Sequence, residues 1–410
     1  MNSPQKVQGG WVTAPETDFD PYANSSLDDP YPHFAKLRDL GPVFFLSRYS
    51  AYGVARHAEV EAVLRDPETF SSGAGVGLSN LQTQTETQWR DPGVILEVDP
   101  PLHARVRKVM GGLLAPASVN KLRPTFEREA ELLVDRVLEK GRFDAVEEVC
   151  KAYPLKVFAD AVGIPAEGRH QYLLPYGDMV FNAFGPVNER FKTCFANAQA
   201  GAIDWIGEVC KREKLTHDGL GARLYRASDE GLLAPDEAPL LVRTLLSAGF
   251  DTTVFTLCHA INSFARHPEQ WALLHANPGL ARQGLEEVLR YESTFHSFYR
   301  TTTCEVEIAE AKLGKGQKIC VFIGSANRDP RRWGKTADRF DITRRSSGHM
   351  AFGTGIHGCV GQMIARLEGE ILLAALAKRV KEIRLEGQPV IHYNNSVRGY
   401  NSMPVRVIVA

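Results

Sequence analysis

The sequence predicts a mainly α-helical protein with a minor β part. A long apolar pattern of helical period spans residues 235–267, shorter helical patterns end at glycine or proline, and strand-like patches lie towards both ends. No internal repeat or low-complexity linker divides the chain. We therefore expect a flexible N-terminal segment, residues 1–20, followed by a single domain, residues 21–410.

The predicted elements follow in chain order. Residues 43–46 and 49–55 are rich in β-branched and aromatic residues and predict strands. Pro101 can open a helix over 102–114, and Gly141 can end another over 122–140. The helix over 235–267 stops before Pro268 and would span roughly 45–50 Å, the width of a domain. The remaining elements are helices over 280–291 and 361–380 and strands over 383–385, 390–393 and 405–409.

Composition excludes several classes of protein. The formal net charge is -1, without the basic excess of a nucleic-acid-binding protein. No run approaches the roughly 20 apolar residues that cross a bilayer, and the first residues contain no apolar signal segment. Seven scattered cysteines without a CxxC pair argue against structural zinc and for a reducing compartment. We expect a cytoplasmic protein with no membrane or nucleic-acid partner.

The strongest motif surrounds one cysteine. Phe352, Gly355, His357, Cys359 and Gly361 have the spacing F-x-x-G-x-H-x-C-x-G, directly before a predicted helix. Glycines let the backbone approach a flat ligand, and the N–H groups of a helix start stabilise a thiolate. A Gly-Cys-Gly turn alone would favour a simpler interpretation, a glycine-rich turn around a buried cysteine.

The complete motif resembles the haem loop of the cytochrome P450 superfamily, in its bacterial soluble class. The resemblance implies that family's helical haem-binding fold with small β-sheets, and haem b with Cys359 as the axial thiolate ligand of its iron. Phe352 would pack beneath the haem ring, and Gly361 would leave room for the following helix.

A second motif agrees with this resemblance. Glu287 and Arg290, at i and i+3, share one helix face. In the family such a pair binds a third basic residue and holds the cysteine loop in place, and Arg339 is the candidate here. The alternative is an exposed helical ion pair, which contributes only a few tenths of a kcal/mol.

A third motif lies midway in the long helix, at residues 248–253. Gly249 and Thr252 favour a local widening of that helix, because an internal glycine weakens it and a threonine hydroxyl can divert a backbone bond. The resemblance implies that Thr252 hydrogen-bonds the oxygen substrate and that Asp251 starts a proton relay. The alternative is a structural Asp-Thr pair in a kinked helix.

Four basic side chains match the family's haem propionate partners. His103 and Arg107 share a helix face at i and i+4. Arg300 and His357 complete the set implied by the resemblance. Buried carboxylates need paired cations, which is the chemistry these residues would supply. Taken singly, each is as compatible with a surface cation.

The substrate prediction rests on a closer resemblance, to bacterial family members that oxidise para-substituted benzoates such as 4-methoxybenzoate. It implies an aromatic clamp, gap-filling residues and a carboxylate-binding end. The clamp would be Leu96, Phe181, Phe184 and Phe298, with Val180 and Ala248 as gap fillers and Arg90, Arg243, Thr244 and Ser247 at the carboxylate end. Each phenylalanine fits plain core packing as well.

Two positions depart from the subfamily pattern. Gly93 replaces a serine that binds the carboxylate, although a glycine N–H could partly compensate. Phe295 replaces a small valine beside the haem and reshapes the pocket. A neutral methoxyphenol, a cinnamate or a para-alkyl arene therefore remains an alternative substrate.

The implied activity is a monooxygenase reaction, in which one oxygen atom of O2 enters a small aromatic substrate by O-demethylation or hydroxylation. Electrons would come from a [2Fe–2S] ferredoxin and its NAD(P)H-dependent reductase, with Arg331 and Arg332 facing the acidic ferredoxin. Two other classes remain open: a haem-binding sensor without turnover, and a hydrolase with Cys359 as nucleophile and His357 or another histidine as base.

Overall fold

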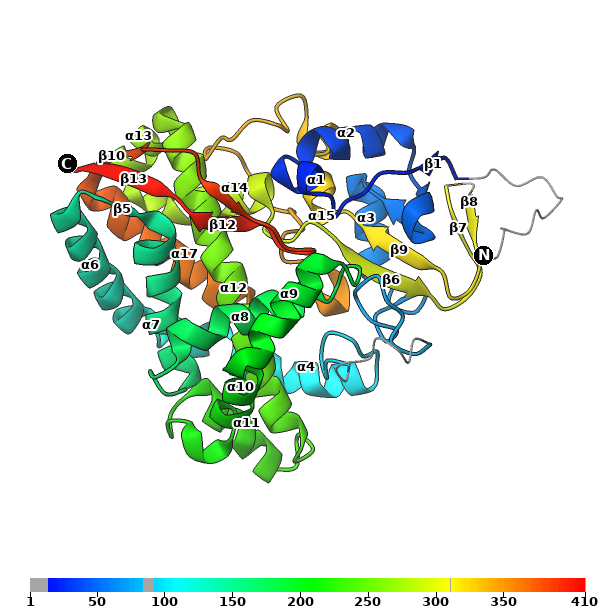
Figure 1. The fold of residues 1–410 in the computed structure, drawn as a ribbon, viewed down its shortest axis with the longest axis horizontal. Helices are drawn as coiled ribbons and strands as arrows, with labels where there is room; N and C mark the ends of the chain where they lie inside the picture. Colours follow the sequence, from blue (N-terminus) through cyan, green and yellow to red (C-terminus); the bar gives the residue numbers. More distant parts are fainter. Residues whose placement is uncertain (1–13, 84–91, 310, 410) are drawn as a thin grey trace.

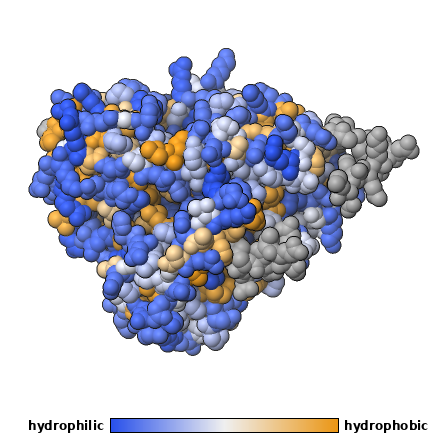
Figure 2. Space-filling view, viewed as in Figure 1, coloured by the Kyte–Doolittle hydropathy of each residue, from blue (hydrophilic) through white to orange (hydrophobic). Residues whose placement is uncertain are grey.

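The computed structural model describes residues 14–83, 92–309 and 311–409. Figure 1 shows a larger helical part that contains the C-terminus and a smaller sheet-rich part on the side of the N-terminus. In Figure 2 hydrophilic side chains cover most of the same face, with apolar side chains scattered between them. The apolar residues of the predicted helices are therefore largely turned inward.

The helices of the larger part have apolar stripes that pack against one another. They are α4 (Leu102–Leu113), α5 (Pro116–Asn120), α6 (Arg123–Lys140), α7 (Ala152–Val162), α8 (Arg169–Asn182), α9 (Glu189–Asn197), α10 (Ile203–Val209), α11 (Leu220–Asp229), α12 (Glu237–Arg266), α13 (Pro268–Ala276), α14 (Ala281–Glu292) and α17 (Gln362–Arg379). Two π-helical turns, η2 (Val146–Lys151) and η3 (Ala198–Ala202), join α7 and α10 to the preceding chain. The shorter helices beside the sheet are α1 (Asn24–Asp28), α2 (Tyr31–Leu40), α3 (His57–Arg65), α15 (Ile323–Ala326) and α16 (Pro330–Trp333).

Helix α12 runs through the middle of the helical part and packs against α7, α8, α11, α14 and α17. Glu237 lies in its first turn, where a carboxylate is favourable to the helix dipole, and also accepts the Ala234 N–H at 2.7 Å. Pro268 follows directly and stops the helix. By length and composition α12 could cross a membrane, but its apolar residues are largely buried inside the protein. It is therefore a core helix.

The main sheet has the strand order β1-β2-β3-β9-β6-β4. Its strands are β1 (Glu16–Thr17), β2 (Phe44–Leu46), β3 (Ala51–Val54), β4 (Phe70–Ser71), β6 (Phe298–Thr302) and β9 (Lys318–Val321). Strands β1 and β2 pair in parallel, as do β3 and β9, while the other pairs are antiparallel. The sheet thus joins the first seventy residues to the segment after α14.

Three smaller sheets complete the fold. Their strands are β5 (Arg142–Asp144), β10 (Val380–Leu385) and β13 (Pro404–Val409) in the order β10-β13-β5, the pair β11 (Val390–His392) and β12 (Gly399–Ser402), and the pair β7 (Val306–Ile308) and β8 (Ala311–Leu313). Strands β11 and β12 lie beside α12. Gly399 of β12 packs so closely on Phe255 of α12 that an added Cβ would overlap the Phe255 ring. This contact brings the C-terminal strands close to the middle of α12.

The structure confirms the predicted helical class with minor β structure and corrects three details. Strands β6 and β9 add β structure between residues 298 and 321, where the sequence predicted none. The helices between residues 152 and 229 were also not predicted. The segment 1–20 is not flexible throughout, because Glu16–Thr17 pairs with β2 inside the main sheet.

Candidate active site

The cysteine loop is a tight turn between the main sheet and α17. Gly353 and Gly355 adopt φ of +66° and +70°, which favour glycine. A Cβ on Gly355 would also overlap a backbone carbonyl of α3. The Cys359 N–H donates to the Phe352 carbonyl at 2.7 Å, which closes the loop. Glycine is thus required here both for backbone conformation and for close packing.

The loop presents the Cys359 thiol to a cavity of about 580 Å³. Burial raises the pKa of this thiol, while the N–H groups of Gly361 and Gln362 and the positive charge of Arg107 act in the opposite direction. Phe352 and Gly361 line the same cavity, as does Thr252 from α12. The cavity therefore joins the cysteine loop to the middle of the central helix, and its volume suits a small organic molecule or a cofactor.

The four predicted propionate partners converge at this cavity from three elements. The rings of His103 (α4) and His357 lie 4.2 Å apart, and the Nε2 atoms of both are buried without a hydrogen-bond partner among the described residues. Arg300 (β6) is buried and donates to the Tyr299 carbonyl at 2.9 Å, and Arg107 lines the cavity. Within the described ranges, no carboxylate lies in ion-pair distance of any of the four.

This crowding of basic groups has an electrostatic cost. Burial lowers the pKa of Arg300 to about 10, and burial together with Arg300, His103 and Arg107 lowers the pKa of His357 to about 3. Buried cations are stable only when anions accompany them. A cofactor with two carboxylates would satisfy these donors, so the residues present fit the two propionates of a haem above the Cys359 thiol.

Glu287 and Arg290 form a bidentate pair with both side chains fully buried. The Arg290 Nε and Nη2 atoms lie 2.8 and 2.7 Å from the two carboxylate oxygens. Arg290 also donates to the carbonyls of Asn327, Ala337 and Arg339 at 2.8–3.0 Å. The pair therefore holds the chain that leads to the cysteine loop, and the alternative of an exposed ion pair is excluded.

The prediction that Arg339 is the third basic member is wrong. Its side chain is exposed and only its carbonyl takes part. Arg344 instead places its Nε 3.3 Å from Glu287 Oε1, and the Ser346 hydroxyl donates to Oε2 at 2.6 Å. The residue type was predicted correctly, but the position was off by five residues because this segment contains several arginines without regular structure.

The predicted widening of α12 is also corrected, because the helix continues unbroken from Glu237 to Arg266. Gly249 serves close packing instead, since a Cβ there would overlap the Phe158 ring of α7. The Thr252 hydroxyl lines the cavity and donates to the Ala248 carbonyl at 2.8 Å. Its oxygen lone pairs therefore remain available to a ligand in the cavity.

Asp251 lies behind Thr252 and does not line the cavity. Its side chain is 1% exposed, and neither carboxylate oxygen has a hydrogen-bond partner among the described residues. Burial raises the pKa of Asp251 well above its ordinary value, and the negative charge of Asp178 adds to this shift. Burial, with no hydrogen-bond partner in the described part of the chain, thus favours the uncharged, protonated form of this group.

Four phenylalanines form a continuous aromatic cluster at the cavity. Phe295 stacks on Phe298 with ring centroids 4.4 Å apart, and Phe181 meets the edge of Phe295 at 5.2 Å. Phe184 lies 6.3 Å from Phe298 and 6.1 Å from Phe181. The predicted pocket residues that also line the cavity are Leu96, Val180, Arg243, Thr244, Ser247 and Ala248. Arg90 lies outside the described residues.

The predicted carboxylate end differs from expectation at Gly93. Its N–H donates to Glu97 Oε2 at 2.9 Å, so it is not free to compensate for the missing serine. Sequence reasoning missed Glu97, although an acidic residue between apolar Leu96 and Val98 is a recognisable signal of a buried charge. The hydroxyls of Thr244 and Ser247 donate to carbonyls of their own helix and can accept from a ligand.

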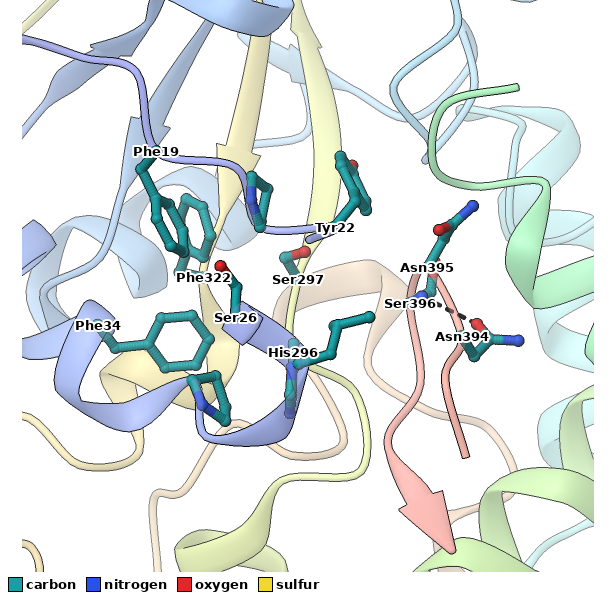
Figure 3. A pocket seen from close by; sticks show the side chains of 13 residues that line it. Phe19, Tyr22, Ser26, Phe34, His296, Ser297, Phe322, Asn394, Asn395 and Ser396 are labelled. Carbon is teal, nitrogen blue, oxygen red and sulfur yellow. Dashed lines mark hydrogen bonds between the residues drawn. The ribbon is translucent and has the colours of Figure 1, made fainter. Parts of the chain in front are cut away.

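A second cavity lies away from this site. Figure 3 shows Phe19, Phe34 and His296 around it, and its volume of about 10 Å³ suits roughly one water molecule. It does not share a lining residue with the larger cavity. The larger cavity is therefore the candidate active site.

The class of haem-thiolate proteins is defined by three features found here: a half-buried thiol in a glycine loop, a large apolar cavity beside it, and basic groups at the cavity edge that have no carboxylate partner among the described residues. Comparisons with known proteins agree. The family model described as Cytochrome P450 matches residues 279–391. Cytochrome p450 CYP199A2 of Rhodopseudomonas palustris is 48% identical over 397 residues, which cover 97% of this chain and 95% of that protein. The chain belongs to the cytochrome P450 family.

Two solved structures extend the comparison. Cytochrome P450 CYP109Q5 from Chondromyces apiculatus superposes with a TM-score of 0.80 at 30% identity, covering 96% of this chain and 98% of the other. Cytochrome P450 CREJ in complex with (4-ethylphenyl) dihydrogen phosphate has a TM-score of 0.85 at 25% identity, covering 95% and 99%. The protein is thus a cytochrome P450 monooxygenase whose cofactor is a haem iron bound by a cysteine thiolate.

Proposed function

We propose that this monooxygenase oxidises a small para-substituted aromatic molecule, by O-demethylation or hydroxylation, with 4-methoxybenzoate as the type of substrate. The aromatic cluster of Phe181, Phe184, Phe295 and Phe298 carries this proposal. Aromatic walls give a flat ring a large contact area at a defined orientation, which selects the substrate atom that points to the reacting oxygen. For a methoxy group, hydroxylation of the methyl yields a hemiacetal that breaks down to a phenol and formaldehyde.

We assign Cys359 as the axial ligand and His103, Arg107, Arg300 and His357 as the propionate partners. When bound, the haem supplies the reductive activation of dioxygen. The thiol faces the cavity, and the N–H groups at the start of α17 support its charged form. The two propionates would supply anionic partners to these four basic groups, of which His103 and Arg300 are buried.

We assign proton delivery to Asp251 and Thr252. Thr252 faces the cavity. Its hydroxyl donates a hydrogen bond to the Ala248 carbonyl, and its oxygen can at the same time accept a hydrogen bond from a proton-bearing group in the cavity. Burial raises the pKa of Asp251 and so favours its protonated form. A general acid that keeps its proton until it is needed suits a reaction that consumes protons inside an apolar cavity. A haem sensor without turnover has no need for such a group.

The substrate's charge is open to two alternatives. Arg243 lines the cavity and supports an acid, with the carboxylate near its guanidinium, whereas the hydroxyls of Thr244 and Ser247 already donate to carbonyls of their own helix. The bond from Gly93 to Glu97 favours the second candidate, a neutral methoxyphenol or para-alkyl arene, because it removes one donor for a carboxylate. The 4-ethylphenyl compound bound by the structural relative CREJ supports a para-substituted phenyl ring in either case.

Bacterial members of the family receive electrons from redox partners, and we propose a [2Fe–2S] ferredoxin and an NAD(P)H-dependent reductase here. Arg331 and Arg332 are exposed, and Arg331 already pairs with Asp329 at 3.1 Å. Arg332 is therefore the better candidate to meet an acidic ferredoxin. A reduction rate that falls as salt rises would support this interface, and a rate independent of salt would contradict it. We expect the protein to act in the cytoplasm.

Ligand titration tests the substrate proposal. The haem-loaded protein is titrated with 4-methoxybenzoate, 4-methoxyphenol, 4-methoxycinnamate and 4-ethylphenol, and the haem spin-state shift is recorded. We expect binding of the benzoate, weakened about 10-fold or more by Arg243→Met, because a charged hydrogen bond contributes about 1.5–3 kcal/mol. Response to the neutral phenols alone would replace the benzoate by the second candidate. Absence of product with any bound ligand and a working electron supply would overturn turnover itself.

A further inference from the structure

Asp251 is in direct contact with the backbone of α8. A Cβ on Gly177 would overlap the Asp251 carboxylate, so the close approach exists only because residue 177 is glycine. The next residue, Asp178, lies close enough to raise the pKa of Asp251 by its negative charge. The buried acid behind the cavity therefore has a second carboxylate as its neighbour.

Asp178 belongs to a hydrogen-bonded cluster that reaches the protein surface. His392 Nε2 lies 2.8 Å from Asp178 Oδ1, the Asn394 amide donates to the same oxygen at 2.7 Å, and the Cys194 thiol donates to Oδ2 at 2.8 Å. The side chains of His392 and Asp178 are 16% and 22% exposed, compared with 1% for Asp251. The cluster thus connects partly exposed side chains to the region of the fully buried Asp251.

The two strands beside α12 hold the histidine in place. His392 Nδ1 lies 2.8 Å from the Asn401 amide oxygen, and the His392 ring stacks on Phe255 at 4.9 Å with planes 26° apart. Phe255 follows Asp251 by four residues and so lies one helical turn further along the same face of α12. The geometry therefore fixes His392 and Asp251 to one region between α8, α12 and β11.

The charges in this region are ordered. The pKa of His392 is raised, because the effect of Asp178 outweighs that of burial. The pKa of Asp178 is lowered, because His392 and the other hydrogen-bond donors outweigh burial. The 2.8 Å contact and these shifts favour an imidazolium and a carboxylate for the outer pair, and burial favours the protonated form of Asp251. The other groups that face the cluster are Lys151 on η2, which binds Glu147, and Arg190 and Cys194 on α9.

We propose that His392 and Asp178 form the proton uptake path that reloads Asp251 during turnover. This rests on the proposed role of Asp251 as the proton donor. When Asp251 gives its proton towards Thr252 and the cavity, it becomes a carboxylate. The His392 imidazolium then passes a proton to Asp178, and His392 takes a new proton from solvent. Because no hydrogen bond joins Asp178 to Asp251 among the described residues, the last transfer, from Asp178 to Asp251, requires rotation of the Asp251 carboxylate towards Asp178 or a water molecule between them. No electron moves in these steps.

The test compares His392→Gln and Asp178→Asn with Cys194→Ala, which touches Asp178 but lies off the path. In haem-loaded wild-type protein, the infrared C=O band of protonated Asp251 is identified by its loss in Asp251→Asn. Asp178→Asn removes the neighbouring negative charge, so the band should disappear at a pH about one unit or more lower than in wild type. Cys194→Ala should leave this midpoint unchanged.

Turnover gives the second readout. With O2 and reductant, both path variants should slow product formation about 10-fold, part of the 100-fold or more that a general acid supplies, and should increase the solvent isotope effect. With hydrogen peroxide as oxygen donor their rates should match wild type, because peroxide brings its own protons. In wild type the O2-driven rate should fall as pH rises past the raised pKa of His392, and His392→Gln should lack this fall.

The outcomes distinguish failure of the uptake path through His392 and Asp178 from failure of Asp251 as the proton donor. Wild-type rates, isotope effect and pH profile in both path variants, with a defect in Asp251→Asn, would refute the path and leave Asp251 as donor. A wild-type isotope effect in Asp251→Asn would refute the donor itself. If Asp178→Asn loads haem poorly, the pH profile of His392→Gln alone decides, because glutamine keeps hydrogen bonds to Asp178 and Asn401 but cannot carry a charge.

Discussion

Glu287 and Arg290 face each other across one helical turn as a fully buried, bidentate ion pair. All the remaining hydrogen bonds of the Arg290 guanidinium go to backbone carbonyls between residues 327 and 339. The pair thus ties α14 to the irregular segment that precedes the cysteine loop. Its importance lies in the burial, because the same pair on a helix surface would contribute little.

Removing the charge of Glu287 should be severe. Glu287→Gln leaves the Arg290 guanidinium buried without its anion, which costs about 3–5 kcal/mol in the free energy of unfolding. We also expect loss of haem during purification, since the segment held by Arg290 leads directly to Cys359. Urea unfolding and the haem-to-protein absorbance ratio measure both effects. A variant with wild-type stability would contradict the buried-charge argument.

The correction from Arg339 to Arg344 gives a matched pair of variants. Arg344→Met removes a donor to Glu287 Oε1 and a bond to the Thr336 carbonyl at 2.7 Å, with an expected loss of about 1–3 kcal/mol. Arg339→Met keeps the carbonyl that Arg290 uses and should change stability by less than about 0.5 kcal/mol. Thermal unfolding of both variants in the same buffer measures which of them loses more stability. The reverse order would restore Arg339 as the third member.

Gly249 gives a prediction about close packing. Gly249→Ala places a methyl group against the Phe158 ring and should destabilise the protein by about 1–3 kcal/mol, although alanine favours the helix itself. Adding Phe158→Leu should recover part of this loss, because the smaller side chain leaves room. Unfolding of the two single variants and the double variant measures the coupling. Simple additivity would show that the two residues do not meet.

Elements with strong local signals could be predicted from the sequence. The helix predicted over 235–267 is observed as Glu237–Arg266, because apolar periodicity and Pro268 are both local. Strands β6 and β9 were missed because their pairing joins segments about twenty residues apart and is completed by β3 and β4 from the first seventy residues. Such pairing leaves no periodic trace in a short buried strand.

The site residues also divide into those that a local motif predicts and those that only tertiary contacts bring together. Residues inside contiguous motifs, such as Cys359 and Thr252, were predicted as site residues from the motifs and the family resemblance that these motifs carry, and both line the cavity. Arg344 could not be chosen over Arg339, since both lie in an irregular segment whose path is set by tertiary contacts. Asp178 and His392 could not be connected to Asp251, because they come from three elements that meet only in the folded chain.

Phe295 gives a prediction about pocket shape. It stacks on Phe298 at 4.4 Å within the cavity, where the resembled subfamily has a valine. Phe295→Val should open space beside the haem and tighten binding of larger para substituents by about 10-fold, since one added methylene contributes about 0.8 kcal/mol and two or three would fit. Phe45→Val, in β2, is the matched control. Titration with 4-methoxy- and 4-butoxybenzoate measures the change, and equal affinities in wild type and Phe295→Val would contradict it.

The last prediction concerns pH and His296, which lies beside the second cavity (Figure 3) with no hydrogen-bond partner for Nε2 among the described residues. Burial lowers the pKa of His296 to about 3, with further lowering by Arg398 and His259. The unfolded chain takes up this proton below its ordinary pKa of about 6.5, whereas the folded chain does not. Stability is therefore lost as pH falls from about 6.5 towards 3, by up to about 1.4 kcal/mol per unit.

His296→Met should make this loss shallower, because the variant has no proton to take up on unfolding. His217→Gln is the control, since His217 is exposed and should leave the slope unchanged. Urea unfolding of the haem-loaded proteins between pH 7 and pH 4 gives the slopes. Equal slopes in wild type and His296→Met would mean that His296 is protonated in the folded protein, and the buried neutral ring would have to be abandoned.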